Sequence, residues 1–140
     1  MLRMRFIGRS NWQEFEVIRH EVQRVVERAC HGEFTTADVE AMIQGGTAFA
    51  GYVVDDASAV HMAGVWELLH YPRMLVVNVM AMGGSGFKVL WPEFGPVLKS
   101  VWRKQGAAAW QCEASPAMTK LLQKSGTGLE AVYITSREKL

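Results

Sequence analysis

Apolar residues in the first part of the chain recur at spacings of three and four, as on the buried face of a helix. This pattern covers residues 12–29 and predicts one amphipathic helix. Residues 34–46 predict a second, shorter helix, with Thr35 and Asp38 as a capping pair and a double glycine at its end. Ahead of both helices, residues 2–7 alternate between apolar and polar side chains and predict a short strand.

Three segments rich in aromatic and β-branched residues follow, which is the composition of β-strands. They cover residues 47–56, 59–73 and 74–82 and are separated by short polar turns. Consecutive strands joined by tight turns form an antiparallel meander. The third segment is apolar throughout apart from Asn78, so we expect a central strand that is buried on both faces.

Prolines set the expected start of the next helix. Pro92 and Pro96 fit best near a helix start, where a missing N–H group costs nothing. The helix is therefore predicted to begin at residues 91–94 and to end near Gly106. Residues 87–90 are then expected to form a separate turn.

The end of the chain adds a strand, a helix and another strand. Residues 107–114 are typical of a buried strand, Ser115 is the expected N-cap of a fourth helix, and residues 129–135 are typical of a closing strand. At 140 residues, with 49% hydrophobic residues, the chain has the size and composition of one compact domain over residues 1–140. The fold class is therefore α/β in the broad sense (α+β).

The charge balance excludes some classes of partner. Fifteen Lys and Arg against fourteen Asp and Glu give a net charge of +1, so nothing in the net charge favours binding to nucleic acid or to an anionic membrane. No segment has the apolar length of a membrane span or a secretory signal, so we expect an intracellular protein that is not secreted. Six arginines within residues 1–30 form the kind of charge run that is usually a solvated face: Arg3, Arg5, Arg9, Arg19, Arg24 and Arg28.

Cysteine and histidine usage gives no sign of a structural metal or a disulfide. Cys30 and Cys112 lie far apart in different kinds of segment, which indicates reduced thiols. The adjacent Cys30 and His31 lack a second ligand pair at zinc spacing, so no metal site is expected.

A glycine-rich loop, "MGGSG" at residues 82–86, joins the apolar strand to the next helix. Consecutive N–H groups at a helix start bind anions, and glycine lets the backbone approach them closely. With this loop, the order of elements resembles the GNAT family of N-acetyltransferases over nearly the whole chain. The resemblance implies a mixed, mostly antiparallel central sheet of about six strands flanked by four helices.

The resemblance also implies a cofactor, acetyl-CoA, inserted between the fourth and fifth strands. In that family the loop wraps the pyrophosphate, the fourth strand pairs with pantetheine, and the fourth helix carries a signature that begins here at Ser115. The cofactor-binding residues that follow from it are Val79, Met80, Ala81, Gly83, Gly84, Ser85, Gly86 and Ser115.

Glu67 and Asn78 are the catalytic candidates. Transfer of an acetyl group to the primary amine of a small molecule or peptide needs a base, and Glu67 would act through a bound water while Asn78 positions water or amine. His61 and His70 are alternative bases. The plainer interpretation of Glu67 is an exposed or arginine-paired strand carboxylate, and a lone strand histidine is more often structural.

Three departures from the family pattern predict a degenerate site. Ala81 stands where the family has Gln or Arg, Leu122 replaces a tyrosine that protonates the departing thiolate, and Pro92 separates the third helix from the loop. We therefore expect acetyl-CoA to bind weakly, with a dissociation constant of about 1 mM or worse.

A second resemblance indicates a different class of protein. The pairing of "MGGSG" with "WPEF" and the small size are also similar to acetyltransferase-like proteins of tailed phages, of the internal virion protein type. This implies a non-catalytic protein, in the host cytoplasm or the virion, whose partners are phage particle proteins or further copies of itself in a homo-oligomer. Trp12, Trp66 and Trp91 would then be contact residues. The sequence leaves both hypotheses, enzyme and assembly protein, open.

Overall fold

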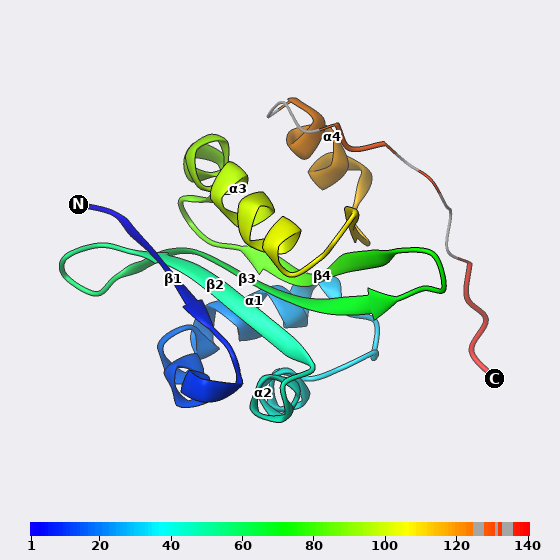
Figure 1. The fold of residues 1–140 in the computed structure, drawn as a ribbon, viewed down its shortest axis with the longest axis horizontal. Coiled ribbons are helices and arrows are strands. Elements are labelled where there is room, and N and C mark those ends of the chain that lie inside the picture. Colours follow the sequence, from blue (N-terminus) through cyan, green and yellow to red (C-terminus); the bar gives the residue numbers. More distant parts are fainter. Residues whose placement is uncertain (125–127, 131, 133–135) are drawn as a thin grey trace.

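A five-stranded sheet forms the centre of the computed structural model, which describes residues 1–124, 128–130, 132 and 136–140 (Figure 1). The strands lie in chain order, so β1 and β5 form the two edges of the described sheet. Neighbouring strands are antiparallel except β4 and β5, which run parallel. The bounds are β1 Arg3–Ile7, β2 Ala48–Val54, β3 Val60–His70, β4 Leu75–Gly83 and β5 Ala109–Cys112.

This arrangement confirms the predicted meander and the mixed, mostly antiparallel sheet. Residues 107–114 do contain a strand, although it is confined to β5, and its residues are exposed or half-buried instead of buried as predicted, because β5 forms an edge of the described sheet. The predicted closing strand at residues 129–135 lies partly outside the described residues, and its described members, Leu129, Glu130 and Val132, are not in a strand.

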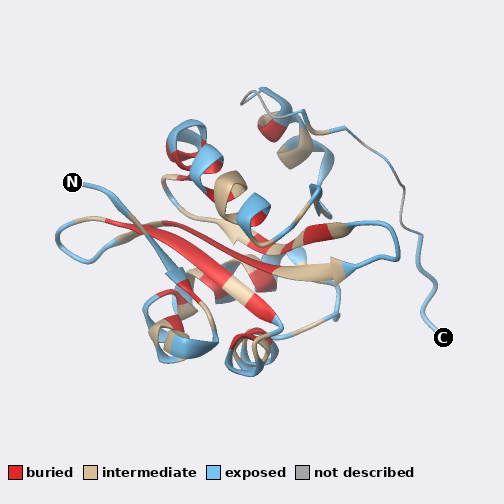
Figure 2. Cartoon of the chain, in the orientation of Figure 1, coloured by how far each residue is buried: buried red, intermediate tan, exposed pale blue. Residues whose placement is uncertain are grey.

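Helices cover both faces of the sheet. On one face lie the 3-10 helix η1 (Arg9–Val17), α1 (Arg19–Ala29) and α2 (Thr36–Gly45), and on the other lie α3 (Phe87–Lys104) and α4 (Pro116–Lys124) (Figure 1). Each face has its own apolar core, and Figure 2 shows the buried residues concentrated along the central strands. None of the described helices has the apolar length needed to cross a membrane.

β4 is central, as predicted. Val77 is 0% exposed and Val79 is 7% exposed, and both contact the core under α3. Met80 packs instead against the core on the α1 side. The strand therefore joins the two cores, which explains its nearly unbroken apolar sequence.

The prediction of one helix over residues 12–29 was wrong, because the segment divides at Ile18 into η1 and α1. Ile18 leaves the helical region, with φ −108° and ψ 1°, and its N–H donates to the carbonyl of Phe15. Both side chains are fully buried. The apolar spacing is kept across the break, so the sequence pattern alone does not show it.

Hydrogen bonds to side chains of the sheet fix the orientation of η1. Glu14 accepts hydrogen bonds from Arg5 on β1 (2.8 Å), from Tyr52 on β2 and from Asn11 (2.9 Å). Burial raises the pKa of Glu14, but these donors together lower it below its ordinary value. Because two of the donors come from strands, a helix that continued straight into α1 would lose them.

The predicted start of the third helix was also wrong. α3 begins at Phe87, directly after the glycine-rich loop, and contains both Pro92 and Pro96. The two prolines are four residues apart on the exposed side, so each carbonyl that lacks a helical N–H donor lies toward solvent, where water can donate a hydrogen bond to it. Burial of the opposite face decides the outcome, through Phe87, Leu90, Trp91, Phe94, Leu98 and Trp102.

The predicted helix caps are confirmed. Thr35 Oγ1 accepts the N–H of Asp38 (3.2 Å), and an oxygen of Asp38 accepts the N–H of Thr35 (2.9 Å). Gly46 ends α2 with φ 82°, a left-handed conformation that glycine adopts without strain. Ser115 Oγ accepts the N–H of Met118 (3.2 Å) at the start of α4.

Two of the three tryptophans expected as contact residues are in the core instead. Trp66 and Trp91 are each 2% exposed, and Trp66 donates from its ring N–H to Gln105 (3.0 Å). Trp12 is half-buried and packs against the core on the α1 side. Trp66 and Trp91 therefore stabilise the domain and are not available to a partner.

Candidate functional site

An irregularity in β4 marks the candidate site. Val65 on β3 pairs with Ala81, whereas the next residue, Trp66, pairs with Val79. Met80 is therefore an extra residue, which forms a β-bulge. A bulge bends its strand and increases the local twist, so β4 changes direction at Met80.

β4 and β5 separate at the same place. Their parallel pairing runs from Val76 to Val79 on β4, and the last pair joins Val79 to Cys112, where β5 ends. β4 continues to Gly83, so in the described part of the chain its edge from Met80 onward has no neighbouring strand on the β5 side. The backbone groups of an unpaired strand edge can form hydrogen bonds with the polar groups of an extended ligand. Burial raises the pKa of the Cys112 thiol at this point, so the thiol stays protonated.

The glycine-rich loop is packed tightly against the start of β3. Gly84 has φ 133°, and a Cβ there would lie 2.5 Å from the carbonyl oxygen of His61 and 2.8 Å from the Cα of Met62. That carbonyl oxygen accepts the N–H of Gly86 at 2.9 Å. At Gly86 a Cβ would lie 3.0 Å from the Leu90 side chain and 3.2 Å from the His61 carbonyl oxygen, so the missing side chains at Gly84 and Gly86 make room for the protein's own atoms. That these glycines also bind a phosphate stays a prediction.

The amides at the start of α3 are free to bind an anion. The N–H of Phe87 donates to Gly84 (3.2 Å) and that of Leu90 to Gly86 (2.9 Å). Within the described residues, the N–H groups of Ser85, Lys88 and Val89 have no protein acceptor. Since α3 follows the loop without a break, these donors lie at the positive end of a helix dipole. The start of α3 therefore offers donors for an anion directly beside the loop, and the expectation that Pro92 separates the third helix from the loop was wrong.

The two catalytic candidates lie side by side. Glu67 and Asn78 are paired across β3 and β4, and Asn78 Nδ2 donates to Glu67 Oε1 at 3.1 Å. Both are half-buried. Their neighbours Trp66 and Val77 pack toward α3, so Glu67 and Asn78 face the opposite side of the sheet. The partner of Glu67 is thus an amide and not an arginine.

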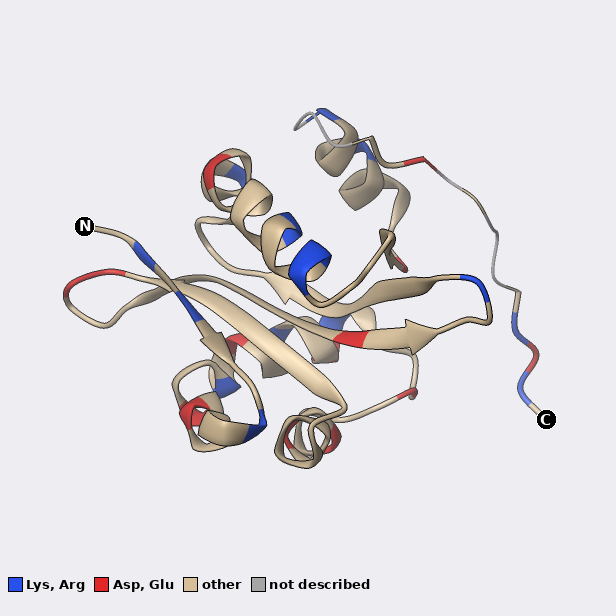
Figure 3. Ribbon diagram, in the orientation of Figure 1, with Lys and Arg blue, Asp and Glu red and all other residues tan. Residues whose placement is uncertain are grey.

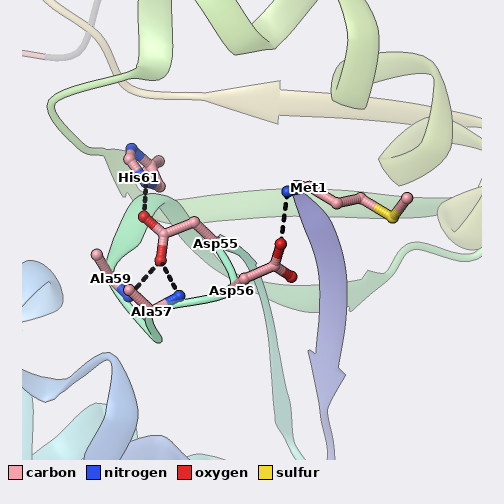
Figure 4. Close-up of polar contacts among 6 residues, drawn as sticks. All are labelled: Met1, Asp55, Asp56, Ala57, Ala59 and His61. Carbon is pink, nitrogen blue, oxygen red and sulfur yellow. Dashed lines mark hydrogen bonds and ion pairs between the residues drawn. The ribbon is translucent and has the colours of Figure 1, made fainter.

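His61 is part of a polar cluster at the β2–β3 turn (Figure 4). Its Nε2 lies 2.8 Å from Oδ2 of Asp55, whose Oδ1 accepts the N–H groups of Ala57 (2.8 Å) and Ala59 (3.0 Å). The hydrogen bond from His61 is the main cause of a lowered pKa at Asp55, together with these amides. His61 therefore holds the turn against the glycine-rich loop, which is a structural role. His70 is exposed at the end of β3.

Of the three residues that depart from the pattern of the family that the sequence resembles, Ala81 and Leu122 lie inside the protein, whereas Pro92 is exposed. Ala81 is 6% exposed and Leu122 is 1% exposed, so neither position offers a cation or a hydroxyl group. Ser115 is exposed and caps α4, and it is not among the residues that line the hollow beside Gly84. The described residues contain no group of three or more His, Cys, Asp or Glu that could hold a metal ion.

Sequence reasoning missed one feature of the site. A hollow of about 200 Å³ lies between the loop and α1, and it is lined by Glu21, Arg24, Val25, Arg28, Gly84 and Ser85. The α1 residues share one face of the helix, a signal that is present in the sequence. What the sequence does not show is that this face lies against the end of β4, because the packing partner of a helix is not encoded locally.

Comparison with known proteins identifies the fold but not a family. The sequence matches no protein-family model and no curated protein. Among solved structures, the chain is similar to an aminoglycoside acetyltransferase from an uncultured soil metagenomic sample, in complex with sisomicin (TM-score 0.75, 6% identity, 99% of this chain and 96% of the other). It is also similar to glucosamine-6-phosphate N-acetyltransferase from Arabidopsis thaliana (TM-score 0.63, 12% identity, 99% of each chain).

A third similar structure is a predicted acetyltransferase with acetyl-CoA from Clostridium acetobutylicum (TM-score 0.65, 8% identity, 98% of this chain and 96% of the other). These likenesses extend over almost the full length of each chain and show that the protein has the fold of the GNAT acetyltransferases. At such low identity they show the fold alone, and the chemistry has to be argued from the site.

Proposed function

We propose that this protein is an acetyl-CoA-dependent N-acetyltransferase that acts on a primary amine. One observation carries the proposal: β4 leaves its neighbour at Met80, and its free edge leads directly to the unpaired amides at the start of α3. A strand edge followed by an anion-binding helix start suits a long ligand with an amide-bearing arm and a diphosphate.

Residues of β4 and α3 would hold the cofactor. Met80 and Ala81, on the unpaired edge just beyond the last β4–β5 pair at Val79, would present backbone groups to the pantetheine arm, and the amides of Ser85, Lys88 and Val89 would receive the diphosphate. Bound acetyl-CoA supplies an acetyl group as a thioester. The part of β4 that would hold the arm of this ligand includes the bulge at Met80, two residues beyond Asn78 along the strand.

Glu67 is the proposed base. Its Oε1 accepts the bond from Asn78, which fixes the carboxylate and leaves Oε2 to accept a proton from a water or from the attacking amine. Asn78 acts as a positioning residue through this bond. A hydroxyl group is absent at Leu122, so the chain offers no proton donor there and turnover is expected to be slow.

Calorimetry with acetyl-CoA tests the proposal most directly. Because the loop and α3 form one continuous anion site, we expect a dissociation constant well below 1 mM, about 10 to 100 μM. Acetyl transfer would then be measured by mass spectrometry on an aminoglycoside, glucosamine-6-phosphate and a lysine peptide, since two of the similar structures are named for the first two acceptors. Absence of both binding at 1 mM and any acetylated product would contradict the proposal.

A further inference from the structure

The hollow between α1 and the glycine-rich loop has the composition of an anion site. Its volume is about 200 Å³, and its walls carry two arginines, Arg24 and Arg28, and one carboxylate, Glu21. The loop side contributes Gly84 and Ser85. The amide of Ser85, one of these lining residues, has no acceptor in the described part of the chain.

Close packing fixes the position of the two arginines. Val25 lies between them in the sequence and packs against Gly83, where a Cβ would come within 2.9 Å of Val25 Cγ2. Gly83 therefore lets α1 approach the end of β4 more closely than any other residue would allow. As a result, Arg24 and Arg28, one helical turn apart, lie on either side of this contact and next to the loop.

The described residues do not neutralise the positive charge of the hollow. Arg28 makes no hydrogen bond or ion pair with any described residue. Arg24 meets Glu21 only at 3.8 Å, a distance typical of a weak ion pair on an exposed helix face. Two cations against one carboxylate leave one net positive charge, to which the amides at the start of α3 add partial positive charge.

We propose that Arg24 and Arg28 bind a diphosphate or a phosphate ester in this hollow, together with the amide of Ser85. Arginine suits this role because its planar group donates two parallel hydrogen bonds to phosphate oxygens. The inference extends the proposed function, on which it rests for the identity of the natural ligand, since acetyl-CoA carries both a diphosphate and a phosphate ester.

The test uses inorganic pyrophosphate as the probe and calorimetry as the measurement. The doubly substituted R24Q/R28Q protein should bind pyrophosphate at least tenfold more weakly than the unsubstituted protein, which corresponds to the loss of one or more charge-assisted contacts. E21Q should bind it several-fold more tightly, because the substitution removes a repelling carboxylate. R73Q is the matched control: it removes the same charge at the exposed β3–β4 turn, at the opposite end of β4, and should leave the affinity unchanged.

The outcomes separate this inference from the proposed function. If pyrophosphate gives no binding heat at millimolar concentration, or binds R24Q/R28Q as it binds the unsubstituted protein, the anion site is wrong. If acetyl-CoA nevertheless binds the unsubstituted protein and R24Q/R28Q equally, the proposed function stands without the anion site. If pyrophosphate binding depends on the arginines while acetyl-CoA does not bind, the anion site stands and its ligand is a different phosphate. Circular dichroism confirms that each variant is folded, as expected for exposed positions.

Discussion

Gly84 lies directly against His61, so that a Cβ on Gly84 would come within 2.5 Å of the His61 carbonyl oxygen. Gly84→Ala should therefore destabilise the fold by more than about 2 kcal/mol, from the positive φ and the backbone clash together. Urea denaturation measures this effect. Gly32→Ala is the control, because Gly32 also has positive φ (95°) but has nothing within 4 Å of its Cβ position, and it should cost only about 1 kcal/mol. Equal effects would show that the contact with His61 contributes nothing.

Val77→Asp should destabilise the protein by about 3 kcal/mol or more. Val77 is 0% exposed and packs in the core beneath α3, where an aspartate would be an unpaired buried charge. Thermal and urea denaturation provide the measurement. Val97→Asp places the same charge on α3 at a position that is 40% exposed, and a loss there of no more than about 1 kcal/mol is expected. An unchanged melting temperature in Val77→Asp would be incompatible with the assignment of β4 as a central strand.

Glu67→Gln should reduce acetyl transfer by about 10²- to 10⁴-fold, which is the usual contribution of a general base. The substitution keeps the shape of the side chain, so acetyl-CoA affinity should change less than twofold. A kinetic assay and calorimetry on the same preparation measure the two effects. Glu93→Gln, on the exposed side of α3, serves as the control and should leave the rate unchanged. A Glu67→Gln protein with full activity would remove Glu67 from the mechanism.

Asp55 should make stability depend on pH in the acid range. In the folded protein its pKa lies below the ordinary value of 3.8, chiefly because of the hydrogen bond from His61. The contribution is therefore complete above about pH 4 and is lost as pH falls through the folded pKa. Asp55→Asn should lose less stability than the unsubstituted protein between pH 4 and pH 2. Urea denaturation at several pH values tests this, and parallel curves for the two proteins would contradict it.

Local patterns predicted the elements whose causes are local. The capping pair Thr35 and Asp38 and the left-handed Gly46 depend on residues within one turn, and the strands follow from β-branched composition. The start of α3 was predicted wrongly because Pro92 and Pro96 were considered without the apolar residues around them. The apolar spacing from Phe87 to Trp102 was present in the sequence, and it shows that both prolines lie on the exposed face.

Features that depend on distant residues were not predictable in the same way. The division at Ile18 follows from the bonds that Glu14 receives from Arg5 and Tyr52, one of which spans 38 positions in the sequence. The bulge at Met80 is a property of the register between two strands and not of β4 alone. In the sequence, Arg24 and Arg28 are typical of a solvated helix face. Only the packing of α1 against Gly83 shows that they line the hollow beside the loop.

The expected connection to phage particles stays a prediction. The solved structures named above are acetyltransferases, and their likeness to this chain does not bear on an assembly role. Burial of Trp66 and Trp91 removes two of the three residues on which that hypothesis relied for partner contacts. The charges in Figure 3 lie mainly on helices and turns and are of both signs.

The edge position of β1 affects how the protein behaves at high concentration. Edge strands with unpaired backbone groups can join the sheets of two molecules and start fibrils. Antiparallel pairing of two β1 strands about Met4 would set Arg3 of one molecule opposite Arg5 of the other. Like charges directly opposite each other destabilise a strand pair, so the two arginines oppose growth of the sheet from one molecule to the next. The edge strand β1 thus helps to protect the protein against aggregation.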